Sequence, residues 1–199
     1  MNAQDELKKI LAAINARDEK NFSAHVDLKN LMDVAYDETT DVLAKNCSKF
    51  HELYPKDLFF KFGSRILRLY NEKFRGVHLG LIKKVISAYF DGSFKDAKNF
   101  SETPIKFLAA ELNNLLKAVR ADFGEEKISG NKAFLKVKMI GDGSSYGRMI
   151  DTLNFVLEFD RRGEEWRLNK IKNVEELVPP ILDIAERYWP ASWDLGIKL

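Results

Sequence analysis

Hydrophobic and polar residues alternate along the second half of the chain, which is the pattern of β-strands with one face against a core. Three runs show this alternation, and their apolar positions are Ala133, Leu135, Val137 and Met139, then Leu153, Phe155, Leu157 and Phe159, then Trp166 and Leu168. Glycine-bearing segments at 141–144 and 161–163 separate the runs. Loops of this length favour antiparallel neighbours, so the pattern predicts an antiparallel sheet.

The intervening positions of these runs are polar, at Lys136, Lys138, Asn154 and Glu158. Because successive side chains point to opposite faces of a strand, we expect one face of the sheet to pack on helices and the other to lie partly in water. Trp166 is expected to be buried where the last strand meets the helices.

The first half of the chain repeats its hydrophobic residues every three or four positions, as amphipathic helices do. Asn2 can cap the first helix, Gly63 interrupts the third region, and Pro104 lies early in the last. We expect the helical part to end at Phe123-Gly124 and the strands to begin after Lys127. The expected helical segments cover residues 2–14, 28–46, 55–76, 79–90 and 101–119.

These patterns predict a single α+β domain over residues 1–199, with a helical part at 1–124 packed on a three- to four-stranded antiparallel sheet at 127–173. A C-terminal helix and tail follow at 174–199. Pro179-Pro180 is expected to break the helical pattern and leave a short helix from Ile181 to Tyr188. The tail from Trp189 to Leu199 is dense in apolar residues, so we expect it to dock. Docking on its own domain is favoured over docking on a second copy, which favours a monomer over a homodimer.

Composition limits the class of protein. At 199 residues with 45% hydrophobic content, the chain can bury one sizeable core. Its formal net charge of +2 makes nucleic acid an unfavoured partner. Cys47 is the only cysteine, which excludes an intrachain disulfide and a cysteine-based zinc site.

The sequence predicts neither a transmembrane segment nor a signal peptide. No apolar run approaches the roughly 20 residues that cross a bilayer, and the amino terminus is too charged for a signal peptide. We therefore expect a soluble chain. A leader removed ahead of Met1 is compatible with the sequence, so the compartment stays open.

Two parts of the chain resemble a known superfamily. They are the opening phrase Asn15-Ala16-Arg17-Asp18 with Phe22 and Val26-Asp27-Leu28, and the closing LNFVLEFDRRGEEWRLNKI. Both look like bacterial members of the nuclear transport factor 2-like superfamily, although several helices stand here between the two parts. Periplasmic phospholipid carriers are similar in outline. Either resemblance implies a concave apolar cavity between sheet and helices, in a superfamily that includes enzymes, carriers and dimerising modules.

Isolated residues give weaker candidates. Cys47 and His51 are spaced as on one helix face, where a thiol and an imidazole can form a nucleophile pair or a metal site, but we favour an ordinary buried thiol with a surface histidine. His25 can act as an acid or base beside a carboxylate, although a structural role is favoured. His78 is isolated.

Two charged or flexible segments were also candidates for ligand binding. Asp33, Asp37 and Asp41 form a carboxylate stripe that can hold a divalent cation, but a solvated helix face is favoured. The segment 141–147 is glycine-rich but lacks the lysine and the following helix of a phosphate-binding loop, so we expect a mobile hairpin loop.

A basic run covers residues 61–84, where seven Lys and Arg residues face the single acid Glu72, an excess of six positive charges. A solvated helix face is the favoured interpretation, followed by contact with an anionic protein or membrane surface, and then by nucleic acid. The residues expected to make an anionic contact are Lys61, Arg65, Arg68, Lys73 and Arg75.

The function that these observations favour is a non-catalytic binding or interaction module with an apolar ligand pocket or a protein partner. The pocket residues expected from the strands are Leu135, Val137, Leu153, Phe155, Leu157 and Trp166, which also suit a simple core. The alternatives are a small lyase or isomerase that uses His25 or Asp151 within the cavity, and a carrier of lipid-like ligands. We expect no cofactor and no metal.

Overall fold

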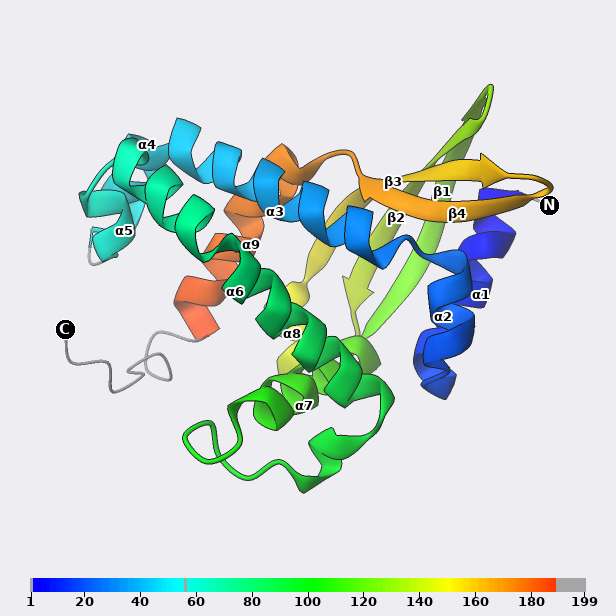
Figure 1. The fold of residues 1–199 in the computed structure, drawn as a ribbon, viewed down its shortest axis with the longest axis horizontal. Helices are drawn as coiled ribbons and strands as arrows, with labels where there is room; N and C mark the ends of the chain where they lie inside the picture. The colour runs from blue at the N-terminus through cyan, green and yellow to red at the C-terminus, as the bar shows by residue number, and fades with distance from the viewer. Residues whose placement is uncertain (1, 56, 189–199) are drawn as a thin grey trace.

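The computed structural model describes residues 2–55 and 57–188, which form an antiparallel sheet accompanied by helices (Figure 1). The strands are β1 (Val119–Ser129), β2 (Lys132–Gly141), β3 (Thr152–Arg162) and β4 (Glu165–Ile171). The helices before the sheet are α1 (Ala3–Ala16), α2 (Glu19–His25), α3 (Leu28–Lys45), α4 (Cys47–Leu53), α5 (Leu58–Lys61), α6 (Ser64–Phe90), the 3-10 turn η1 (Ser93–Asp96) and α7 (Pro104–Lys117). The later helices are α8 (Ser145–Ile150), between β2 and β3, and α9 (Val174–Tyr188). The predicted α+β class is confirmed.

The sheet has the strand order β1-β2-β3-β4, with every neighbouring pair antiparallel. Leu135 is paired with Leu157 and Val137 with Phe155, so the predicted apolar sets lie side by side on one face of the sheet. Trp166 is 3% exposed and belongs to the main core, as expected. The alternation of the sequence therefore identified the buried face of β2, β3 and β4 correctly.

One residue of the opposite face differs from expectation. Lys136, Lys138 and Asn154 are exposed, but Glu158 is only 3% exposed. Its carboxylate pairs with the ammonium group of Lys132 and lies 3.7 Å from that of Lys172. Because two cations neutralise it, Glu158 can be buried where an unpaired carboxylate would be costly.

Strand β1 begins at Val119, well before the predicted start after Lys127, so Phe123-Gly124 does not end the helical part. The pairing of β1 with β2 shifts between Phe123 and Glu126, which marks a bulge. Gly124 lies in this bulge, where a Cβ atom would come 3.2 Å from Cβ of Lys136. The bulge interrupts the alternation of β1, and that interruption concealed the strand in the sequence.

Helix α6 runs unbroken from Ser64 to Phe90, where the sequence suggested two segments separated near Gly76. A glycine inside a helix costs about 1 kcal/mol relative to alanine, which the tertiary contacts of a long helix can offset. The break predicted at Gly63 is confirmed, because its φ of 84° separates α5 from α6.

Helix α9 also continues where a break was expected, through Pro179 and Pro180. A proline removes one backbone donor and crowds the preceding turn, which usually ends or kinks a helix. Here Val174, Leu177 and Val178 are buried on the first turns of α9, so packing holds the helix together across the prolines. The short helix predicted from Ile181 is therefore the second half of a longer one.

The glycine-rich segment after β2 leads into the helix α8, where the sequence predicted a hairpin loop with no following helix. Oγ of Ser144 caps this helix by accepting a hydrogen bond from the backbone N–H of Gly147 at 3.1 Å. A Cβ atom on Gly141 would come 1.9 Å from the carbonyl oxygen of Gly147. The glycines therefore permit two backbone segments to approach closely. From the sequence pattern alone, glycines needed for such an approach look the same as glycines of a flexible loop.

Two hydrophobic clusters form the interior. The larger one lies between the sheet, α1, α2, α7 and the end of α6, and the smaller one gathers α4 and α5 with parts of α3, α6 and α9. The long helices α3 and α6 contribute to both clusters and lie side by side in Figure 1. None of the described helices is long and apolar enough to cross a membrane. The tail at 189–199, for which docking was predicted, lies outside the described residues.

Candidate functional site

A cavity of about 360 Å³ lies between the apolar face of the sheet and the helices α1 and α3. Thirteen of its fifteen lining residues are apolar. The helices contribute Leu7, Leu11, Ile14, Asn15, Leu31 and Leu116, and the strands contribute Val119, Arg120, Ala121, Val137, Met139, Phe155, Leu157, Leu168 and Ile171. The cavity is thus an apolar space built by every strand of the sheet together with the apolar face of α1.

Both ends of α1 are tied to other elements, which fixes this wall of the cavity. At the beginning of α1, the backbone N–H of Ala3 donates to Oε1 of Glu126 on β1 at 2.9 Å. At its end, the hydroxyl of Tyr89 on α6 donates to the carbonyl oxygen of Ile14 at 2.9 Å. The helix is therefore held across the sheet by a hydrogen bond near each end, in addition to its buried apolar residues.

The cavity is open to solvent, in contrast to the core beside it. Leu135 and Phe159 are fully buried in that core, whereas Leu11, Ile14 and Phe155 around the cavity are only half-buried. A protein interior is normally packed to the density of an organic crystal. Large apolar side chains that line an unfilled, solvent-reached hollow therefore form a surface that an apolar molecule can cover.

The two polar lining residues, Asn15 and Arg120, are both exposed. Nε of Arg120 lies 3.7 Å from a carboxylate oxygen of Asp122, which is exposed as well. Among the lining residues there is no carboxylate, imidazole, thiol or amine. The cavity therefore offers apolar contact, one side-chain amide and one guanidinium group, and no acid–base pair.

The predicted pocket residues divide into two groups. Val137, Phe155 and Leu157 line the cavity, whereas Leu135, Leu153 and Trp166 are buried in the interior and do not line it. The lining residues of α1 were missed because the prediction considered only the strands. Their spacing on an amphipathic helix was visible, but which helix covers the sheet is a tertiary property.

The residues of the enzyme alternative do not line the cavity. Nδ1 of His25 lies within hydrogen-bond distance of Glu6, which is fully buried, and Nε2 lies 3.1 Å from Oδ1 of Asn21. The carboxylate that accompanies His25 is thus Glu6 of α1. Asp151 is exposed at the end of α8. A lyase or isomerase needs its acid or base within reach of the bound substrate, which these positions do not provide.

Two of the other single-residue candidates, Cys47 and His78, have local partners. The thiol of Cys47 is buried, donates to the carbonyl oxygen of Phe60 at 3.4 Å, and has its pKa raised by burial, which disfavours a nucleophilic thiolate. His51 is half-buried and not a surface residue. His78 is not isolated either, because its Nδ1 lies 2.7 Å from the hydroxyl of Tyr36.

The carboxylate stripe of α3 lies beside the basic run of α6: Asp37 and Asp41 are exposed, as expected for a solvated face, but all three carboxylates also pair with arginines of α6. Arg75 lies 3.0 Å from Asp33 and 2.7 Å from Asp37, and Arg68 pairs with Asp41. A hydrogen bond from Lys29 lowers the pKa of Asp33 further. Within residues 2–55 and 57–188, no group of three or more His, Cys, Asp or Glu side chains is placed to hold a metal ion.

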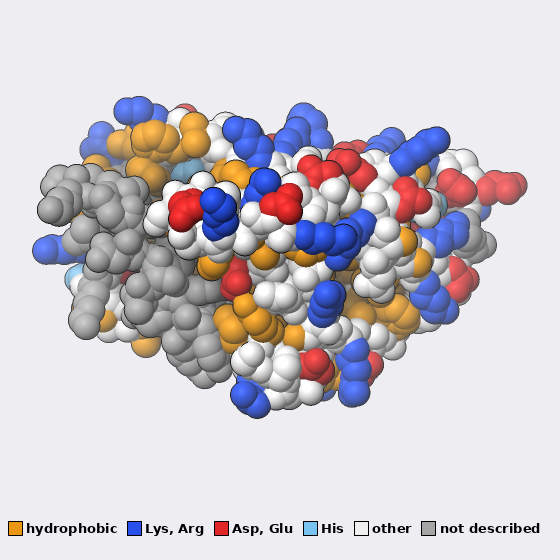
Figure 2. Space-filling model, turned by 90° about the horizontal axis from the view of Figure 1, so that it is seen from below, with side chains coloured by type: hydrophobic (Ala, Val, Ile, Leu, Met, Phe, Trp, Pro, Cys, Tyr) orange, Lys and Arg blue, Asp and Glu red, His pale blue; other side chains and the backbone are white. Residues whose placement is uncertain are grey.

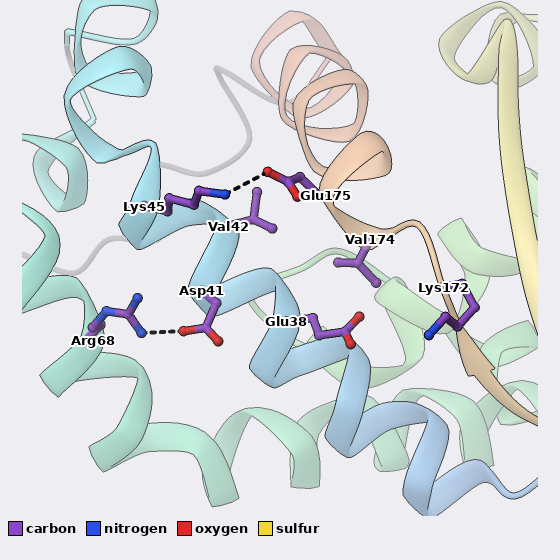
Figure 3. Close-up of a pocket in the computed structure, with 8 residues that line it drawn as sticks. All are labelled: Glu38, Asp41, Val42, Lys45, Arg68, Lys172, Val174 and Glu175. Carbon is purple, nitrogen blue, oxygen red and sulfur yellow. Dashed lines mark hydrogen bonds and ion pairs between the residues drawn. The ribbon is translucent and has the colours of Figure 1, made fainter.

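A second hollow, of about 500 Å³, lies between α3, α6 and the beginning of α9 (Figure 3). Three acidic and three basic side chains line it. Lys45 pairs with Glu175 at 3.2 Å and Arg68 with Asp41. Glu38 pairs with Lys170 and Lys172 lies 3.7 Å from Glu158, two residues outside the lining. Since these charges compensate one another, the groove has no surplus charge with which to select a ligand, and the apolar cavity is the better candidate.

No family model, curated protein or solved structure matches this chain. The resemblance to the nuclear transport factor 2-like superfamily therefore stays a prediction.

Proposed function

We propose that this protein binds a small apolar ligand in the cavity between α1, α3 and the sheet, without catalysing a reaction on it. The observation that carries the proposal is the composition of an open cavity in which thirteen of fifteen lining residues are apolar. Its volume of about 360 Å³ lies at the small end of the range of about 300–1,000 Å³ that is usual for ligand pockets.

The driving force for such binding is the removal of apolar surface from water. Each Å² that is covered contributes about 25 cal/mol. Half-buried side chains such as Ile14 and Phe155 would lose their remaining contact with water when a ligand fills the space. The chemistry favours an aliphatic or aromatic molecule, and a lipid-like ligand of small size is one member of this class.

A filling variant tests the proposal. Ala121 lines the cavity from β1, so Ala121→Trp should occupy part of the space. Ile128→Trp places the same side chain on the same strand at a position outside the cavity lining, where the native residue is 57% exposed. The probe is the neutral dye Nile red, whose fluorescence rises in apolar surroundings.

We expect the wild type and Ile128→Trp to bind Nile red, and Ala121→Trp to lose most of this binding. Absence of dye binding by the wild type would contradict the proposal. Equal binding by the two variants would contradict it as well, because the dye would then occupy another surface. Circular dichroism of each variant verifies that it is folded.

A further inference from the structure

The outward side of α6 carries an unusual concentration of exposed hydrophobic residues. Five of the nine large hydrophobic side chains that are exposed in the described chain lie on α6, and Phe62 lies just before it. We define the α6 outer surface as the exposed residues Phe62, Ile66, Leu69, Val77 and Leu81 with the basic residues Lys61, Arg65, Lys73, Lys83 and Lys84. Scattered exposed hydrophobics are ordinary in proteins, but a contiguous set marks an interaction surface.

The residues of this surface are contiguous because of helical geometry. Leu69, Lys73 and Val77 follow one another at intervals of four along α6, which places them in one row on a helix of 3.6 residues per turn. Ile66 precedes this row by one turn and Leu81 follows it by one turn. Val77, in the middle, is 65% exposed. The row therefore runs along most of the length of α6.

The opposite side of α6 is already occupied within the protein. Leu67 and Tyr89 are buried in the two hydrophobic clusters. Arg68 and Arg75 pair with carboxylates of α3. The outer surface is thus held facing away from the protein by contacts on the inner side, and none of its apolar residues is needed for those contacts.

The exposed charge of this surface is positive. Arg68 and Arg75 are neutralised by α3, but Lys61, Arg65, Lys73, Lys83 and Lys84 remain exposed. Glu72 is the single acidic residue between positions 61 and 90. Figure 2 shows hydrophobic side chains beside Lys and Arg side chains at its upper left, at the end of the protein where α4, α5 and the beginning of α6 lie in Figure 1. The surface combines an apolar row with an excess of four positive charges.

We propose that the α6 outer surface docks on the anionic surface of a lipid bilayer. A helix that lies in the plane of a bilayer interface places aliphatic side chains among the acyl chains and lysines against anionic headgroups. Leu69, Val77 and Leu81 supply the aliphatic row, and the lysines beside them supply the complementary charge. This inference stands independently of ligand binding in the cavity.

The aliphatic character of the row favours a bilayer over nucleic acid. Single-stranded nucleic acid binds to basic surfaces on which aromatic rings stack with bases. The rings of Tyr70 and Phe74 are half-buried and pack against each other, with centroids 4.7 Å apart. Phe62 is the single exposed ring of the α6 outer surface as defined, whereas Ile66, Leu69 and Val77 have no planar face to stack on a base. A second copy of the chain is disfavoured because it would bring the same excess of positive charge to the contact.

Vesicle co-sedimentation of the full chain tests the inference, with vesicles of phosphatidylcholine alone and of phosphatidylcholine mixed with phosphatidylglycerol. The charge variant is Lys73→Glu with Lys84→Glu. Its matched control, Lys117→Glu with Lys138→Glu, changes the net charge equally at exposed positions of α7 and β2. The apolar variant is Val77→Ser, and its matched control is Ile128→Ser on β1.

We expect the wild type to sediment with the mixed vesicles at low salt and to be released at high salt. The charge variant should bind at least about tenfold more weakly, because each basic residue near the surface contributes about fivefold to affinity. Val77→Ser should also weaken binding, and both controls should bind like the wild type. Each variant is verified as folded by circular dichroism.

Several outcomes would overturn the inference. One is the failure of the wild type to bind the mixed vesicles; another is equal weakening by the controls and by the surface variants. Retention on heparin or single-stranded DNA that Val77→Ser leaves unchanged, without vesicle binding, would assign the basic residues to nucleic acid. A dimer that Val77→Ser converts to a monomer would assign the row to a second copy. Nile red binding that Ala121→Trp removes and Val77→Ser leaves unchanged reports on the cavity, so the two proposals fail separately.

Discussion

Arg75 donates hydrogen bonds from Nε and Nη2 to the two carboxylate oxygens of Asp37, at 2.7 and 2.9 Å, and so joins α6 to α3. This two-point geometry is specific to a guanidinium group, because the ammonium group of lysine cannot present two parallel donors to one carboxylate. The same Arg75 also lies 3.0 Å from Asp33. One arginine thus gathers two members of the carboxylate stripe that the sequence left facing solvent.

We predict that Arg75→Lys lowers the stability of the protein although it preserves the charge. The lysine keeps the attraction but loses the paired hydrogen bonds, so the loss should be modest for a pair that is partly exposed. Urea unfolding at low and high salt measures it. The control is Lys73→Arg, an exchange in the opposite sense on the outer side of α6, which should leave the midpoint unchanged. An Arg75→Lys midpoint equal to that of the wild type would show that the paired geometry has no energetic role.

The second prediction concerns acid. The pKa of Asp33 lies below its ordinary value of 3.8, chiefly because Lys29 donates a hydrogen bond to its carboxylate. A lowered pKa in the folded state means that the ionised form stabilises folding above the ordinary pKa, and that this stabilisation disappears as pH falls through the lowered pKa. Asp33→Asn should therefore be less stable than the wild type at pH 7, and the difference should shrink at acid pH.

Urea unfolding across the acid range measures this convergence. Glu164→Gln, in the exposed turn between β3 and β4, is the matched control and should follow the wild type at every pH. If the difference between Asp33→Asn and the wild type stays constant down to the lowest pH, the carboxylate of Asp33 does not stabilise folding through its charge.

The third prediction concerns the core. Trp166 is 3% exposed and is packed in the larger cluster, so Trp166→Ala should lower the free energy of unfolding by about 3–5 kcal/mol. The loss arises from the apolar surface that is no longer buried and from the cavity that remains. Denaturant unfolding measures it, with Trp166→Phe as a milder replacement that should cost less. A loss below about 1 kcal/mol would place Trp166 outside the core.

The fourth prediction tests whether α6 is continuous. A Cβ atom on Gly80 would meet no other atom within 4 Å, and this glycine lies inside the helix. Gly80→Ala should therefore stabilise the protein by about 0.5–1 kcal/mol, because alanine loses less conformational freedom in a helix. Gly63→Ala should do the opposite, since Gly63 has a φ of 84° that alanine adopts only with strain. Destabilisation by Gly80→Ala, measured by thermal unfolding, would indicate a helix broken near this position.

Where the hydrophobic period was regular, the sequence was a reliable guide to the structure. The pairing of Leu135 with Leu157 and the burial of Trp166 followed from alternation on strands. The limits of α3 were predicted almost to the residue. Asp27 caps the start of this helix, and the apolar repeat of the sequence stops where the helix ends. The cavity was predicted in part, since Val137 and Phe155 line it from the strands.

Other features were decided by contacts between distant parts of the chain. Gly124 occupies a bulge because β1 must pass close to Lys136, and no local pattern records that approach. Helix α9 continues through Pro179 because Val178 and its neighbours are buried, which outweighs the local preference for a break.

The sequence by itself determined which residues are apolar and with what period, and this was enough for the α+β class and for the buried face of the sheet. Only the tertiary structure decided that α1 covers that face incompletely and that Asp37 meets Arg75 of another helix. The physical reason is the range of the interactions. Periodicity records how a residue relates to its neighbours along the chain, whereas an unfilled cavity and an ion pair between helices depend on where two separate segments come to lie.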